Sequence, residues 1–154
     1  MPLQPGDPAP AFDLPGDAGP VSLAALKGKT VVLYFYPKDD TPGCTTEAQG
    51  FTAAAADFEK AGAVVVGVSK DTVARHAKFR AKYGLTPLLG SAADDDIIER
   101  YGAWVEKSLY GRQYMGIDRS TFLIDGTGII RRVWRKVKVA GHVAEVLKAA
   151  QELN

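Results

Sequence analysis

Two continuous apolar runs stand out along the chain. The first, Thr30–Tyr36, reads TVVLYFY, and the second, Ala63–Ser69, reads AVVVGVS. Both are rich in β-branched residues and show no alternation with polar residues, a pattern typical of strands that are buried on both faces of a sheet. We therefore expect two strands in the interior of one sheet.

The segment between these runs has the period of a helix. From Cys44 to Lys60, apolar residues recur every three or four positions, and Gly62 then supplies a stop signal. A strand, a helix and a second strand in this order predict that the two strands are parallel. The apolar positions of the predicted helix are Ala48, Phe51, Ala55 and Phe58.

The rest of the chain adds further elements of both kinds. We expect a short N-terminal hairpin, a helix with Asp71 as its N-cap candidate and Gly84 as its terminator, a short helix near Ile97, and a β-hairpin that turns at DGTG. This order predicts a single α/β domain over residues 1–154, a central mixed β-sheet flanked by helices. A thioredoxin-like fold is the simplest architecture that fits. The ranges are Phe12–Leu14 with Val21, Asp71–Tyr83, Ile97–Tyr101, Ser120–Ile124 with Ile129–Trp134, and a last helix at His142–Glu152.

Composition and net charge narrow the range of functions that the protein can have. The 46% of hydrophobic and 24% of charged residues are those of an ordinary globular protein, and 19 basic against 18 acidic residues leave a net charge of +1. Such a balance offers no field that would hold nucleic acid or an anionic membrane surface. The longest apolar run is far too short to span a bilayer, and the first ten residues do not resemble a signal peptide, so we expect a cytoplasmic protein.

The chain contains one cysteine, Cys44. A single thiol excludes an internal disulfide, a CxxC redox pair and a cysteine-based zinc site. Thr41 has the character of an N-cap and Pro42 that of a first helical residue, which places Cys44 in the first turn of the predicted helix. Unpaired N–H groups and the positive end of the helix favour the nucleophilic thiolate there. Because the neighbours at positions 43 and 45–47 are small or polar, we predict a reactive thiol rather than an inert buried one.

The spacing Pro37-x-x-x-Thr41-x-x-Cys44 resembles the active-site motif of the peroxiredoxins. The longer string FYPKDDTPGCTTEAQGF resembles the bacterioferritin comigratory protein branch of that family, and the similarity extends from PGDPAPAFDLP through GVSKD to GIDRSTFLID. The resemblance implies a thioredoxin-like fold. It also implies thiol-dependent reduction of hydrogen peroxide and organic hydroperoxides without a metal or organic cofactor.

The resemblance also implies roles for particular residues. The Thr41 hydroxyl, the N–H of Cys44 and the guanidinium of Arg119 would donate hydrogen bonds to the peroxide, while Pro37 would shield the sulfur from water. Glu47 is expected to support the site for a different reason: it lies three residues after Cys44, and so on the same helix face, from which its carboxylate would orient Arg119.

Three further positions complete the expected site and its surroundings. Gly43 is a second supporting residue, and Arg112 is a weaker candidate than Arg119. The aromatic residues Trp104 and Tyr110 are expected in a loop that could line the access of alkyl hydroperoxides.

The chain departs from many members of this branch in lacking a resolving cysteine. The two positions where one is found are Gln49 and Arg80 here. The sulfenic acid formed at Cys44 therefore needs an external thiol, which leaves thioredoxin, glutaredoxin, glutathione and a second subunit open. We expect a monomer, with a dimer as the alternative.

Two other functions compete with the peroxidase. In a cysteine hydrolase, His76 or His142 would activate Cys44, although both histidines are more simply helix-surface or helix-start residues. In a peroxide sensor or a thioredoxin-fold binding module, Cys44 would react once per chain. Measured turnover with a supplied thiol separates the sensor from the enzyme.

Overall fold

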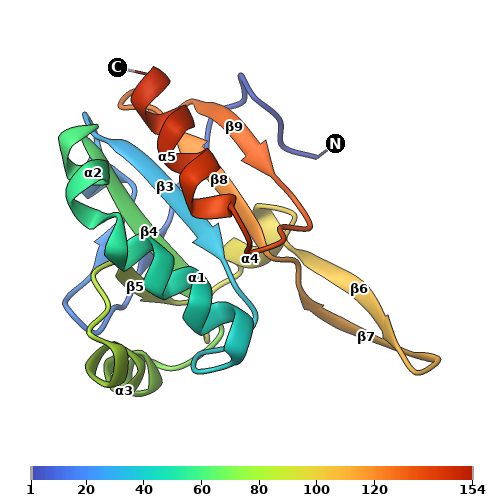
Figure 1. Cartoon of the computed structure of the whole chain (residues 1–154). Coiled ribbons are helices and arrows are strands. Elements are labelled where there is room, and N and C mark those ends of the chain that lie inside the picture. Colours follow the sequence, from blue (N-terminus) through green and yellow to red (C-terminus); the bar gives the residue numbers. More distant parts are fainter. Residues whose placement is uncertain (1, 154) are drawn as a thin grey trace.

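The computed structural model describes residues 2–153 and is built on a central five-stranded sheet with the strand order β5–β4–β3–β8–β9 (Figure 1). Strands β3, β4 and β5 are parallel, whereas β8 runs antiparallel to β3 and β9 antiparallel to β8. The predicted mixed sheet and its parallel pair are thus confirmed. The strands are β3 (Thr30–Phe35), β4 (Ala63–Ser69), β5 (Leu88–Ser91), β8 (Ser120–Ile124) and β9 (Ile130–Trp134).

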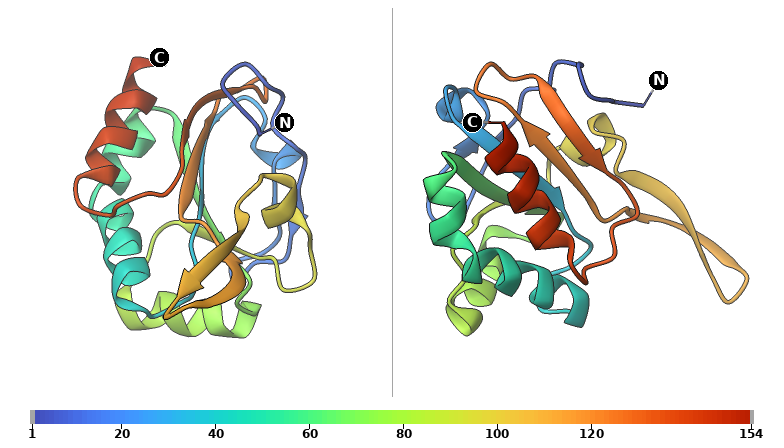
Figure 2. Two further views of the ribbon diagram at one scale, coloured as in Figure 1. Left: turned by 90° about the vertical axis from the view of Figure 1, so that its right-hand side faces the viewer. Right: turned by 45° about the horizontal axis from the view of Figure 1, so that its top comes forward.

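Helices and the N-terminal segment cover the two faces of this sheet. Helices α1, α2 and α5 lie on one face, and the N-terminal segment and α4 lie on the other (Figure 2). The N-terminal segment holds the predicted short hairpin, formed by β1 (Asp13–Leu14) and β2 (Val21–Ser22). The helices are α1 (Pro42–Ala53), α2 (Ala55–Lys60), α3 (Val73–Tyr83), α4 (Ile97–Arg100) and α5 (His142–Glu152), together with a 3₁₀ turn at Ala24–Leu26.

Strand β3 separates two apolar clusters. Val32 and Tyr34 point into the cluster beneath α1 and α5, while Val31, Leu33 and Phe35 point into the cluster beneath the N-terminal segment and α4. All six residues of β3 are buried. A strand with no polar face is therefore the central strand, as its sequence predicts.

The predicted helix from Cys44 to Lys60 is two helices. The first begins two residues earlier, at Pro42, and ends at Ala53, and the second begins at Ala55, with Ala54 as the residue between them. The Thr52 hydroxyl donates to the Ala48 carbonyl and accepts from the Thr86 N–H. Such a back-bond from a threonine bends a helix, which gives a local reason for the break.

The start of α3 also differs from the prediction. Its N-cap is Thr72, whose hydroxyl accepts from the Arg75 N–H, and not Asp71. The Asp71 carboxylate is instead used in contacts described below. At the other end, Gly84 adopts the left-handed conformation (φ 62°) of the predicted terminator.

The segment that carries Trp104 and Tyr110 is a hairpin and not a loop. Strands β6 (Trp104–Leu109) and β7 (Arg112–Ile117) pair antiparallel and project away from the domain (Figure 1). Tyr110 lies in the turn at the tip and is 96% exposed, so it lines no access path. Trp104, at the base, packs against the core cluster of the α4 face.

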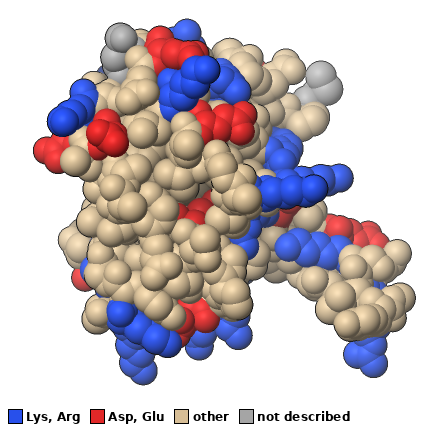
Figure 3. Space-filling view, in the orientation of Figure 1, with Lys and Arg blue, Asp and Glu red and all other residues tan. Residues whose placement is uncertain are grey.

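On the face of the molecule seen in Figure 3, basic and acidic side chains are interspersed, and no broad region carries a single charge. Among residues 2–153, no helix is long and apolar enough to cross a membrane.

Candidate active site

Cys44 is the third residue of α1, in the first turn as predicted, and α1 follows β3 after the loop of residues 36–41. Thr41 precedes the helix in an extended conformation, and its carbonyl accepts the first helical hydrogen bond, from the Thr45 N–H at 2.8 Å. The Thr41 hydroxyl does not cap the helix, because it donates to the Lys38 carbonyl at 2.8 Å. Its single hydrogen is therefore not free for a peroxide, contrary to the donor role that the resemblance implies, and its oxygen keeps its lone pairs for another donor.

The Cys44 side chain is 2% exposed and belongs to the apolar cluster beneath α1 and α5. The thiol is therefore buried, contrary to what its small and polar neighbours in sequence suggest. The reason is helical geometry: positions 44, 48 and 51 share one face, so Cys44 faces the sheet together with Ala48 and Phe51. Of its polar neighbours in sequence, Thr46 is exposed, whereas Thr45 and Glu47 are buried.

Arg119 is distant from Cys44 in the sequence but lies next to its sulfur in the structure. Its Nη2 lies 3.4 Å from the Cys44 Sγ. Arg119 directly precedes β8, whose first residue, Ser120, pairs with Phe35 at the end of β3. Because the chain leaves β3 at that point to enter α1, the antiparallel register brings Arg119 to the start of the same helix.

Glu47 and Gly43, the two residues predicted to support the site, both lie next to Arg119. The Glu47 Oε1 accepts from Arg119 Nη1 at 2.8 Å, and the Glu47 side chain is fully buried, with Oε2 lacking a hydrogen-bond partner among residues 2–153. A Cβ at Gly43 would lie 3.1 Å from Arg119 Nη2. The arginine fork thus bridges the carboxylate and the sulfur, and Gly43 leaves room for it.

Burial acts in opposite directions on the pKa values of Glu47 and Arg119. Burial raises the pKa of Glu47 from its ordinary 4.5 to about 7, although Arg119 opposes the shift. Burial lowers the pKa of Arg119, but the charges of Glu47 and Cys44 outweigh it, and the net direction is upward. At neutral pH, Arg119 is therefore charged and Glu47 is near its midpoint.

Glu47→Gln should remove one pH dependence of stability. Between about pH 4.5 and 7, the folded chain keeps a proton on Glu47 that the unfolded chain has lost, so the wild-type free energy of unfolding falls through this window and levels above it. The variant has no such titration. Its free energy of unfolding relative to wild type should rise by on the order of 2 to 3 kcal/mol across the window. Urea unfolding of both chains at each pH measures the difference, and parallel curves would contradict the assignment.

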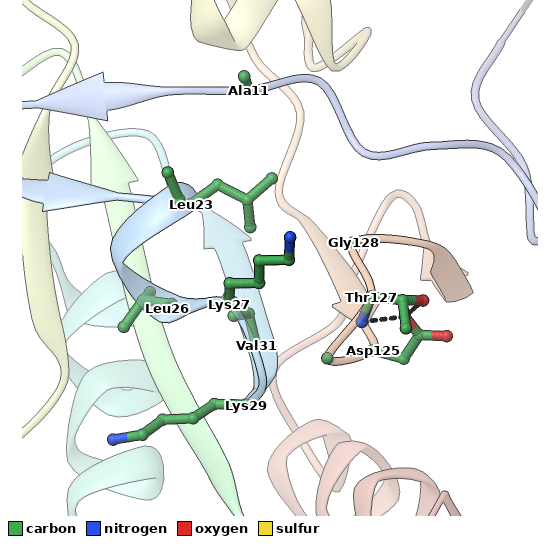
Figure 4. A pocket seen from close by; sticks show the side chains of 11 residues that line it. Ala11, Leu23, Leu26, Lys27, Lys29, Val31, Asp125, Thr127 and Gly128 are labelled. Carbon is green, nitrogen blue, oxygen red and sulfur yellow. Dashed lines mark hydrogen bonds between the residues drawn. The ribbon is translucent and has the colours of Figure 1, made fainter.

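Pro37 lies in the loop before α1, and of two hollows in the protein one borders α1 and the other lies far from Cys44. Pro37 is exposed in the loop between β3 and α1. A groove of about 710 Å³ runs between α1 and α5, along the helix face that carries Gly43 and Thr46. A second cavity, of about 190 Å³, lies at the opposite end of β3 around Val31, away from Cys44 (Figure 4).

Neither histidine is placed to activate Cys44. His76 is fully buried and not on the helix surface, and its ring nitrogens contact Asp39 and the Gly90 carbonyl. His142 begins α5, and its Nε2 is 2.8 Å from the Thr121 hydroxyl. These contacts occupy both ring nitrogens of His76 and Nε2 of His142, and neither ring has a hydrogen bond to Cys44 within residues 2–153, so this alternative loses its support.

The remaining sequence candidates lie away from the sulfur or serve other contacts. Arg112 is exposed on the projecting hairpin. Gln49 is exposed on α1, and Arg80 on α3 is paired with Asp17 and the carbonyls of Leu85 and Pro87.

Known proteins resemble this chain in sequence and in structure. A profile of the AhpC/TSA family matches residues 5–133. Peroxiredoxin Bcp of Bacillus subtilis is 46% identical over 155 residues, covering 100% of this chain and 99% of its own, and that of Xanthomonas campestris is 47% identical over 145 residues, covering 92% and 91%.

Solved structures agree with these relatives. A cysteine-to-serine mutant of PrxQ from Xylella fastidiosa matches with a TM-score of 0.93 at 37% identity and covers 99% of this chain and 98% of its own. The bacterioferritin comigratory protein of Xanthomonas campestris, studied for its alkyl peroxide reduction activity, matches at 0.89 and 42%, with the same coverage.

The chain belongs to the AhpC/TSA family and has the thioredoxin-like fold of its peroxiredoxins. Within that family it is a peroxiredoxin of the bacterioferritin comigratory protein branch, in a form with a single cysteine. Its enzyme class is that of the thiol-dependent peroxidases.

Proposed function

We propose that this peroxiredoxin reduces hydrogen peroxide and organic hydroperoxides through Cys44, which becomes a sulfenic acid and is recycled by an external thiol. The observation that carries the proposal is the 3.4 Å contact between Arg119 Nη2 and the Cys44 Sγ, in a fork held by the buried Glu47. The fixed cation stabilises the thiolate and faces the place where negative charge develops during attack.

The first step transfers one peroxide oxygen to sulfur. The Cys44 thiolate forms an S–O bond as the O–O bond breaks, and the other oxygen leaves as hydroxide or alkoxide and takes up a proton. Sulfur loses two electrons, and the peroxide gains them. The Thr41 hydroxyl already donates to Lys38, so its oxygen accepts the hydrogen of the incoming peroxide. Pro37 limits the access of water to the loop side of the site.

The second step needs a thiol from outside the chain. That thiol attacks the sulfenic sulfur, forms a mixed disulfide and releases water, and a second thiol then frees Cys44. Thioredoxin, glutaredoxin and glutathione all supply this chemistry. Because Cys44 is 2% exposed, the first turn of α1 must open for the attack, whichever thiol is used. We propose a monomer as the working state.

The groove between α1 and α5 supports organic hydroperoxides as substrates. It is lined mainly by small or apolar residues, including Pro42, Gly43, Val139 and Val143, and lies on the helix face next to Cys44. An alkyl chain buried there would carry its hydroperoxide toward the first turn of α1.

Turnover with a supplied thiol tests the proposal. We expect continuous consumption of hydrogen peroxide and of cumene hydroperoxide with at least one of glutathione, glutathione with glutaredoxin, or thioredoxin with its reductase. Peroxide loss that stops at one equivalent per chain with every reductant would favour the sensor. No loss at all would exclude the peroxidase.

A further inference from the structure

A buried polar network underlies the loop between β3 and α1. In this loop, residues 36–41, the Asp39 side chain is nearly fully buried. Its Oδ1 accepts from the Tyr36 hydroxyl at 2.6 Å, and its Oδ2 lies 2.7 Å from His76 Nδ1. The Asp39 main-chain N–H donates to Asp71 Oδ2 at 2.8 Å. Both the side chain and the backbone of Asp39 are thus held by residues outside the loop.

His76 connects this loop to two other elements. It lies on α3 and is fully buried, and its second ring nitrogen, Nε2, is 3.1 Å from the Gly90 carbonyl of β5. Both partners, the Asp39 carboxylate and the Gly90 carbonyl, are hydrogen-bond acceptors, so each contact uses a proton on the ring nitrogen that faces it. The bond to Asp39 is short and buried, which makes it the stronger of the two. One side chain therefore ties α3, β5 and the loop together.

Asp39, Asp71 and His76 could also be interpreted as a metal site, since their ligand atoms lie within 4.8 Å of one another. Those atoms are, however, already used within the protein. Asp71 Oδ2 accepts from the Ser69 hydroxyl as well as from Asp39, and Asp71 Oδ1 accepts from Arg75 Nε. We therefore interpret the cluster as a hydrogen-bond network.

Helix α3 contacts the loop at a second point. Asp40 has a left-handed backbone (φ 60°), unusual for a residue other than glycine, and its carboxylate accepts from Lys82 Nζ at 2.8 Å and from the Tyr83 hydroxyl at 2.6 Å. These contacts are solvent-exposed and contribute little by themselves. The buried contact of His76 with Asp39 is the principal connection.

We propose that His76 is a positioning residue for peroxide reduction: through Asp39 it holds loop 36–41 in the conformation that presents Pro37 and Thr41 to the Cys44 site. The inference rests on the proposed function, in which the loop binds the peroxide. Tyr36, which shares Asp39 with His76, lies in the same apolar cluster as Cys44. A displacement of about 1 Å in such a loop can slow a reaction by about 100-fold.

Two amide substitutions at His76 separate positioning from mere stability. Asn places its amide nitrogen near the position of Nδ1 and can still donate to Asp39, whereas Gln places it near Nε2 and keeps only the contact with Gly90. We expect the second-order rate constant of Cys44 with hydrogen peroxide to fall at least tenfold in His76→Gln. In His76→Asn it should stay within threefold of wild type. Stopped-flow fluorescence or competition kinetics measures both.

Three controls accompany this pair. Alkylation of Cys44 by iodoacetamide should stay within threefold of wild type in both variants, because Arg119 and the helix start are unchanged. Arg80→Ala removes a different anchor of α3, at Asp17, and should lower the melting temperature while the peroxide rate stays within threefold. Asp39→Asn keeps the size of the side chain and should slow the reaction with peroxide as His76→Gln does. It replaces His76→Gln in the test if that variant does not fold.

The outcomes are distinct. Equal slowing in His76→Asn and His76→Gln, or slowing in Arg80→Ala, would overturn the inference in favour of general stability of α3. Rates within threefold in both His76→Gln and Asp39→Asn would also overturn it. A wild-type chain that is alkylated normally but does not react with peroxide would instead refute the proposed function itself.

Discussion

Arg119→Ala is expected to slow the reaction of Cys44 with hydrogen peroxide by about 10²- to 10³-fold. The substitution removes a charged donor that faces the sulfur at 3.4 Å inside a mostly buried site. Losing one such donor from an oxyanion-type site costs about 2.7 to 4 kcal/mol of transition-state stabilisation. Single-turnover stopped-flow measurements, with the protein in excess over peroxide, give the rate without interference from recycling.

Suitable controls exist in the same chain. Arg112→Ala removes an exposed arginine from the projecting hairpin and should leave the rate unchanged. Arg119→Lys keeps the charge but not the planar fork that reaches both Glu47 and Cys44, so it should fall between wild type and alanine. Circular dichroism and melting curves establish that each variant is folded. A rate within threefold of wild type in folded Arg119→Ala would remove this arginine from the mechanism.

Without a reductant, excess peroxide should inactivate the wild-type chain completely. No second cysteine can trap the sulfenic acid, so Cys44 is free to proceed to sulfinic and then sulfonic acid. Intact-mass spectrometry after stepwise addition of peroxide should show the gain of one, two and then three oxygens. Glutathione or thioredoxin, added before the second equivalent, should divert the first product into a mixed disulfide and preserve activity.

Cys44→Ser is the matched control for this experiment, because the half-exposed Met115 can also take up oxygen. Any oxygen gained by the serine variant belongs to methionine and is subtracted. A covalent dimer as the main product at low protein concentration would point to a subunit partner. A product two hydrogens lighter than the thiol would indicate a sulfenamide.

The sequence pattern predicts the interior of the fold better than its margins. Strands β3 and β4 are buried on both faces, and their unbroken apolar runs are a strong local signal. Strand β5 has only four residues, and the solvated strands β6 and β7 show no regular alternation. Tyr110 and Gly111 form the hairpin turn with positive φ at both residues, as a type I′ turn requires, and the glycine at the second position is the only part of this turn that the sequence signals.

The motif predicts where the reactive thiol lies but not how it is enclosed. Thr41, Pro42 and Cys44 are neighbours in sequence, so local helix-start chemistry places them without knowledge of the rest of the fold. Burial of Cys44 depends on which helix face meets the sheet. That face is chosen by the packing of Ala48 and Phe51 against β3 and α5, and not by the polar residues next to Cys44.

The sequence by itself determined the α/β class, the central parallel strands and a single thiol at a helix start, because each depends on residues close together in the chain. The tertiary structure alone decided what meets that thiol. Arg119 is 75 positions from Cys44 and reaches it only because Ser120 pairs with Phe35. His76 is 37 positions from Asp39 and contacts it only because α3 packs against the loop. Contacts at such separations follow from strand register and helix packing, which no local pattern encodes.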